Sequence, residues 1–153
     1  MVHHSGIRKM TFADVPAVYA IEKAVAVGPW TEKLFSDCIK VGYDCWVIID
    51  GEQIMGYGIL SYAANEAHIL QLAIHPEYHR HGLGQKLLQH LLNMAKIHGG
   101  NEVFLEVRDS NTPAISLYKK YNFVEIGIRK GYYPGIAEGQ PKQDAITMAL
   151  PLW

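Results

Sequence analysis

Residues 68–96 read HILQLAIHPEYHRHGLGQKLLQHLLNMAK, and this stretch decides the fold. Its first part, residues 69–74, is an apolar run of the kind that forms a buried strand. A break at His75-Pro76 and a short basic loop with two glycines follow. From Leu83 the apolar residues recur mostly at intervals of three and four, which predicts an amphipathic helix. A glycine-containing loop that leads into a helix offers free backbone N–H groups at a positive helix end, so the stretch predicts a phosphate site.

Composition is that of an ordinary soluble globular protein. The chain has 153 residues, of which 49% are hydrophobic and 19% charged, and its formal net charge is −1. This length suits one domain, which we expect over residues 1–153. The small net charge argues against nucleic acid or an anionic membrane as a partner. We see neither an apolar run that spans a bilayer nor a signal peptide, so we expect a cytoplasmic protein.

The cysteines and the terminal histidines carry little functional information. Cys38 and Cys45 lack CxxC spacing, so we expect both to be reduced and structural. The pair His3-His4 is too short to define a tag, and a native pair or a remnant of a tag would both fit it. Three further histidines, at positions 75, 79 and 81, lie around a turn without a Cys or carboxylate set at ligand spacing. We therefore expect no metal.

The chain predicts alternating strands and helices in the order β-α-α-β-β-β-α-β-α-β-β, which indicates one α/β or α+β domain with a mixed sheet. Three local signals fix element ends: Thr31 as a helix N-cap, Asp50-Gly51 as a hairpin turn, and Asn122 just after a helix. We expect strands at 6–11, 44–49, 53–62, 69–74, 102–107, 123–129 and 144–151, a glycine- and proline-rich loop at 130–142, and helices at 15–24, after 31, at 83–98 and at 113–121.

Three motifs carry a resemblance to a known family: LAIHP at 72–76, YHRHGLGQKLL at 78–88 and FLEVRDSNTPAISLYKKYNF at 104–123. In this order and spacing they resemble the GCN5-related N-acetyltransferase (GNAT) superfamily over essentially the whole chain. Within the superfamily, the chain looks like the bacterial members that acetylate the N-terminal alanine of small-subunit ribosomal protein number eighteen. The GPWT motif at 28–31 and DAITM at 144–148 add to this similarity. The resemblance implies the GNAT fold, a mixed sheet of about six to seven strands flanked by about four helices.

The resemblance also implies acetyl-CoA as co-substrate, with its pyrophosphate on the loop before the long helix. The glycines there let the backbone approach a phosphate, although a GxG before a helix also occurs as an ordinary tight turn. His79 departs from the family, which usually has Gln or Arg in this slot. Because the ligands there are mainly backbone N–H groups, we expect this change to affect reinforcement by a side chain more than binding itself. The implied pyrophosphate site comprises Arg80, His81, Gly82, Leu83, Gly84 and Gln85.

By the same resemblance, the main chain of Leu72, Ala73 and Ile74 holds the pantetheine arm, and a backbone N–H polarises the thioester carbonyl. Their side chains would still be those of a core strand. Asn111 occupies the family position that contacts CoA, while the pattern alone makes it a helix N-cap. One residue can do both.

Glu106 and Tyr118 fall where relatives place the general base and the general acid. From the pattern alone, Glu106 belongs to a polar strand face, because it shares parity with Glu102 and Arg108. By resemblance it takes a proton from the attacking amine, directly or through water. Tyr118 would protonate the leaving thiolate, since a phenol near pKa ~10 can protonate a thiolate near ~8.5. Its alternative is a core aromatic.

The acceptor is implied by resemblance and favoured by amine chemistry. At pH 7 an α-amine is about 10% neutral, whereas a lysine is neutral only about once in 2,500 molecules. We therefore expect direct transfer, in a ternary complex, to the N-terminal alanine of the ribosomal protein by a monomeric enzyme. Other protein N-termini, lysines or a small amine remain alternatives, as does a non-catalytic CoA-binding module. Residues 132–135 (YYPG) would then wall the peptide groove or form a packed aromatic turn.

Overall fold

The computed structural model describes residues 5–153, so His3 and His4 lie outside the described residues. The elements follow the predicted order. Seven strands form one mixed sheet in the order β1-β2-β3-β4-β5-β7-β6, which confirms the expected α/β fold with four flanking helices. The strands are β1 (Ser5–Lys9), β2 (Asp44–Asp50), β3 (Gln53–Ala63), β4 (Glu66–Ile74), β5 (Glu102–Arg108), β6 (Val124–Tyr133) and β7 (Gln143–Pro151); the helices are α1 (Val15–Val25), α2 (Glu32–Lys40), α3 (Leu83–Ile97) and α4 (Thr112–Lys120).

Local sequence signals account for several element ends. The Thr31 hydroxyl accepts a hydrogen bond from Leu34 N at 3.2 Å, as an N-cap of α2 should. Asn122, with φ +74°, takes the left-handed conformation after α4, and Gly51 does so in the hairpin turn after β2. All three predicted signals are confirmed.

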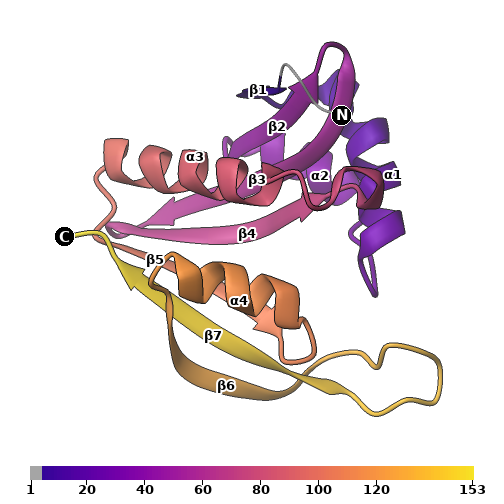
Figure 1. The fold of residues 1–153 in the computed structure, drawn as a ribbon, viewed down its shortest axis with the longest axis vertical. Coiled ribbons are helices and arrows are strands. Elements are labelled where there is room, and N and C mark those ends of the chain that lie inside the picture. Colours follow the sequence, from indigo (N-terminus) through magenta and orange to yellow (C-terminus); the bar gives the residue numbers. More distant parts are fainter. Residues whose placement is uncertain (1–4) are drawn as a thin grey trace.

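Two helices lie on each face of the sheet, but those on one face cover only part of it (Figure 1). Leu88 and Leu91 of α3 share one core with Tyr118 of α4, so these two helices lie on one face. On the opposite face, α1 and α2 pack against β2, β3 and β4 through a second core that includes Val18 and Phe35. Side chains of β5 on that second face remain partly exposed. The sheet therefore keeps an accessible surface next to α1.

Strand β6 is longer than predicted. The expected loop at 130–142 is wrong in its first part, because β6 continues to Tyr133, which pairs with Gln143 of β7. The register shifts between Arg129 and Tyr133, where Gly131 adopts φ +59°. Its N–H donates to Asp144 Oδ1 at 2.8 Å, so a side chain replaces the lost backbone partner. Strand β6 can therefore continue beyond Gly131.

Two further features bear on the sequence expectations. Cys38 and Cys45 are buried and free, as expected of structural thiols, and burial raises the pKa of Cys45 to about 12. Among residues 5–153, no helix combines the length and apolar character needed to cross a membrane.

Candidate active site

The site begins where two parallel strands part. Strands β4 and β5 pair only from Glu66 to Ile69 on β4, and the last pair joins Ile69 to Leu105. At this point Leu70 is an extra residue in the pairing of β4 with β3, and such a bulge bends its strand and increases its twist. From Leu70 to Ile74, the edge of β4 that faces β5 has no strand partner among the described residues. Its main-chain groups are available to an extended ligand.

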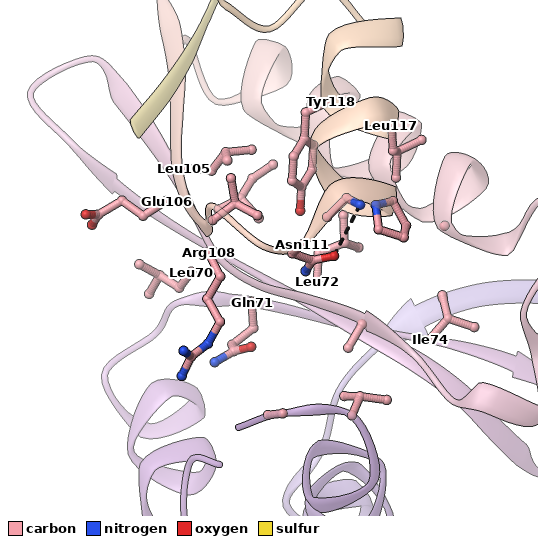
Figure 2. A pocket seen from close by; sticks show the side chains of 18 of the residues that line it. Leu70, Gln71, Leu72, Ile74, Leu105, Glu106, Arg108, Asn111, Leu117 and Tyr118 are labelled. Carbon is pink, nitrogen blue, oxygen red and sulfur yellow. Dashed lines mark hydrogen bonds between the residues drawn. The ribbon is translucent and has the colours of Figure 1, made fainter. Parts of the chain in front are cut away.

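A pocket of about 1420 Å³ occupies this opening and the space beside it (Figure 2). Pockets for single small ligands usually measure about 300–1,000 Å³, so this one has room for a large donor together with an acceptor. Every predicted site residue lines it except His81 and Gln85. The Gln85 side chain instead accepts a hydrogen bond from the Tyr121 hydroxyl at 3.4 Å, and so faces α4.

The loop before α3 has the geometry of an anion site. Arg80 and Gly82 both adopt left-handed φ values, +69° and +73°, which is uncommon for a residue other than glycine. The first hydrogen bond of the helix runs from Lys86 N to Gly82 O at 3.1 Å. The N–H groups that precede Lys86 in the first turn therefore have no helical acceptor, and they lie at the positive end of the helix dipole. Together these features fit a phosphate.

His79 ties this loop to the end of β4. Its Nε2 donates to Ile74 O at 2.7 Å, so the unusual residue in this slot braces the loop on the strand. Gly84 lies close to the same strand end and to α4, because a Cβ at this position would be 3.7 Å from Leu117 Cδ2. The phosphate loop and the open edge of β4 thus form one continuous surface.

Glu106 and Tyr118 lie on opposite sides of β5. Leu105 and Val107 point into the core that contains Tyr118, and Glu106 alternates to the other face. In Figure 2 the Tyr118 hydroxyl enters the pocket from α4, while the Glu106 carboxylate, which also lines the pocket, points away from Tyr118. Burial raises the pKa of the Tyr118 phenol, with a smaller contribution from Tyr133, so Tyr118 stays protonated at neutral pH. The two predicted groups could therefore act on different reactants.

The Glu106 carboxylate is close to one cation. Arg129 Nε lies 3.1 Å from Glu106 Oε2, and the Glu106 side chain is 29% exposed. The distance makes an ion pair, but Oε2 is a buried atom to which no donor within the described chain makes a well-directed hydrogen bond. This oxygen therefore has an unfilled hydrogen-bond acceptor site.

Several polar residues of the pocket were not predicted from the sequence, among them Glu22 and Arg108. Glu22 of α1 is only 2% exposed, and it accepts hydrogen bonds from Trp30 N at 2.9 Å and from the Tyr57 hydroxyl. A signal existed, because Glu22 lies one helical turn after Val18 on the buried face of α1. Arg108, the second residue, bonds to backbone and side-chain oxygens of three distant segments. Nothing local in the sequence indicates those partners.

Aromatic residues at the end of β6 complete the pocket on the Glu106 side. Tyr132, Tyr133 and Pro134 line it, and the two tyrosine rings pack edge to face with centroids 5.0 Å apart. Burial raises the pKa of Tyr133 to about 12, and the nearby charge of Glu106 adds to the effect. This segment is therefore a wall of the pocket, and its two tyrosines belong to the packed end of β6 rather than to a turn.

The histidines of the loop have local roles. His75 Nδ1 accepts a hydrogen bond from Glu77 N at 3.0 Å, which caps the short turn at Pro76–Tyr78. Within residues 5–153, no group of three or more His, Cys, Asp or Glu side chains is arranged to hold a metal ion.

Known proteins are similar to this chain both in sequence and in structure. The model of the Acetyltransferase (GNAT) family matches residues 15–123. A ribosomal protein bS18-alanine N-acetyltransferase from Escherichia coli is 36% identical over 95% of this chain and 97% of its own length. The enzyme of the same name from Haemophilus influenzae is 34% identical over 95% and 98%.

Solved structures agree with these relatives. The crystal structure of the ribosomal-protein-S18-alanine N-acetyltransferase from Escherichia coli superposes with a TM-score of 0.89 at 35% identity, covering 97% of this chain and 94% of that one. Ard1 from Thermoplasma volcanium gives a TM-score of 0.88 at 27% identity, over 97% and 98%.

Proposed function

The chain belongs to the acetyltransferase (GNAT) family, and on that premise we propose that it acetylates the N-terminal alanine of ribosomal protein bS18. It is an N-acetyltransferase, and acetyl-CoA, the donor used by this family, is its co-substrate. The observation that carries the proposal is the parting of β4 and β5 after Ile69 and Leu105. This opening joins a phosphate-binding loop on one side to a carboxylate and an aromatic wall on the other.

We propose that the donor lies along the open edge of β4. Backbone groups there can pair with the amides of the pantetheine arm as a strand would, and one N–H can polarise the thioester carbonyl. The first turn of α3 and its preceding loop would bind the pyrophosphate. Asn111 would contact the donor while its Oδ1 caps α4 through Ala114 N, at 3.3 Å. The proposed contacts are Leu72, Ala73, Ile74, Arg80, His81, Gly82, Leu83, Gly84, Gln85 and Asn111.

The proposed chemistry is a direct transfer in a ternary complex. The acceptor nitrogen forms a bond to the thioester carbonyl carbon, and the bond from that carbon to sulfur breaks. Glu106 takes the proton lost by the nitrogen, and Tyr118 donates its proton to the departing sulfur. Their positions on opposite faces of β5 support this division, because the amine and the thiolate then approach from different sides.

An α-amine suits this single carboxylate. With a pKa of about 8, an N-terminal amine needs only modest help to lose its proton, whereas a lysine near 10.4 needs far more. The full-length similarity to two bS18-alanine N-acetyltransferases supports the identity of the acceptor.

We also propose that residues 1–153 form one domain that acts as a monomer in the cytoplasm, without nucleic acid or a membrane. One sheet contains every described strand, which supports a single domain. Glu106 and Tyr118 belong to the same chain, so the proposed chemistry requires no second copy. The net charge of −1 supports a protein rather than a nucleic acid as partner.

The test compares cells with and without the protein. Mass spectrometry of bS18 should find the N-terminal alanine acetylated only when the protein is present. Acetylation that disappears instead from other protein termini, from lysines or from a small amine would replace the proposed acceptor. Purified protein that binds CoA but acetylates nothing across a peptide panel would indicate a non-catalytic module.

A further inference from the structure

Arg108, the last residue of β5, connects three segments around the Glu106 side of the pocket. Its Nη1 donates to Pro134 O at 2.7 Å and to Gln143 Oε1 at 3.0 Å. Its Nη2 donates to Val27 O at 3.3 Å, across 81 residues of sequence. The guanidinium also lies 4.6 Å from the centroid of the Tyr133 ring.

Two of these segments are loops that meet beside the pocket. Val27 belongs to the connection between α1 and α2, and Pro134 begins the connection between β6 and β7. The two loops come close together, because a Cβ added at Gly28 would lie 3.5 Å from Pro134 Cγ. Glu22 fixes the first loop at a second point through Trp30 N, at 2.9 Å. Arg108 is therefore the one side chain among these that holds both loops.

The three oxygens that Arg108 contacts are all neutral, two being backbone carbonyls and one an amide. A planar guanidinium has five N–H donors in a fixed fork, so it can reach several acceptors at once. Lysine has its donors at a single point on a flexible chain and cannot reproduce this fork. The arrangement depends on shape as well as on charge.

We propose that Arg108 is a positioning residue that holds the α1–α2 and β6–β7 loops together as one wall for the acceptor peptide. The proposal rests on the proposed function, in which the acceptor approaches from the Glu106 side. In Figure 2 the guanidinium points, with Gln71, to the side of the strands away from Tyr118. Arg108 would thus set the affinity for the acceptor and leave the binding of the donor unchanged.

The first test is steady-state kinetics of Arg108→Met and Arg108→Lys. We expect KM for an N-terminal-alanine peptide to rise about tenfold or more in both variants, because charge-assisted hydrogen bonds contribute enough for that factor. KM for acetyl-CoA should stay within about twofold, since the donor side is intact. Arg8→Met is a matched control, because Arg8 makes a two-pronged pair with Asp14 away from the pocket, and both its KM values should stay at wild type.

Hydrogen–deuterium exchange tests the wall itself, independently of the acceptor. In Arg108→Met, residues 26–31 and 134–142 should lose protection together, and Arg8→Met should leave both unchanged. Millimolar methylguanidinium should restore part of the protection and part of the acceptor KM in Arg108→Ala. Unchanged protection in folded Arg108→Met, or equal rises in both KM values, would overturn the role of Arg108. If both segments lose protection while the acceptor KM stays unchanged, the proposed acceptor side is wrong. A variant that fails to fold would show that Arg108 stabilises the whole fold rather than this wall.

Discussion

Ile69 of β4 and Leu105 of β5 are the last residues to pair across the two parallel strands, and the proposed catalytic site lies where the strands part after them. A parallel pair that parts in mid-sheet exposes main-chain groups that would otherwise bond to each other. Here the opening has Tyr118 on the face that α3 and α4 cover and Glu106 on the other. A thioester that lies between the strands would meet one group on each side.

Glu106→Gln should lower turnover by about 10²–10⁴-fold, the usual contribution of a general base. KM for acetyl-CoA should not change, because Glu106 lies across β5 from the donor side. Steady-state kinetics would check both values. Glu102→Gln is the matched control, since Glu102 is an exposed residue of the same strand, outside the pocket. Turnover near wild type in Glu106→Gln would show that Glu106 is not the base.

Tyr118→Phe should lower turnover while the fold and the binding of CoA are retained. The ring is buried in the core and stays in place, so only the proton donor is lost. Rapid-quench measurement of the chemical step, with calorimetry of CoA binding, would separate the two effects. Tyr121→Phe, at the residue that follows α4, removes a hydroxyl that lies outside the pocket, and it should keep the wild-type rate of the chemical step. Equal rates in the two variants would contradict the role of Tyr118.

Stability should fall in alkali. Burial raises the pKa of Tyr118, and it raises that of Tyr133 to about 12, whereas an unfolded tyrosine titrates near 10. Above about pH 10 the folded state therefore binds more protons than the unfolded state. The free energy of unfolding should keep its neutral-pH value below about pH 10 and fall as the pH rises toward about 12. Urea titrations at several pH values would measure the slope. Tyr118→Phe should make it shallower, and an identical slope would count against a buried phenol.

Gly82→Ala should weaken donor binding. At φ +73° an alanine costs about 1–2 kcal/mol, and the loop would relax away from the phosphate site. KM for acetyl-CoA should rise several-fold and KM for the peptide should not. Gly51→Ala imposes similar strain at φ +61° in the β2–β3 hairpin, where a Cβ also meets nothing within 4 Å. That control should lose similar stability but keep its KM values; parallel kinetic changes would show a general effect of strain.

Much of the fold could be predicted because its signals are local. The caps at Thr31 and Asn111 and the turn at Gly51 each depend on residues within one turn of chain. The predicted strand at 123–129 ends too early, because the glycine at position 131 favours a loop, whereas β6 continues to Tyr133. What overrides that signal is the Asp144 side chain, thirteen positions along the chain.

The site was less predictable for the same physical reason. A resemblance located Glu106 and Tyr118, but their placement on opposite faces follows from strand alternation and from the docking of α4. The parting of β4 from β5 depends on a bulge opposite another strand, and Arg108 finds its partners across 26 to 81 residues. Such long-range pairings leave no periodic trace in the sequence.

The most direct test of the account is to give the purified protein acetyl-CoA and two peptides and to locate the acetyl group by tandem mass spectrometry. One peptide has the N-terminal sequence of bS18 with a free alanine amine, and the other has a blocked terminus and a free lysine. The account predicts acetyl on the alanine nitrogen alone, and far less of it with Glu106→Gln. Acetyl on the lysine, or none on the alanine while CoA still binds, would contradict it.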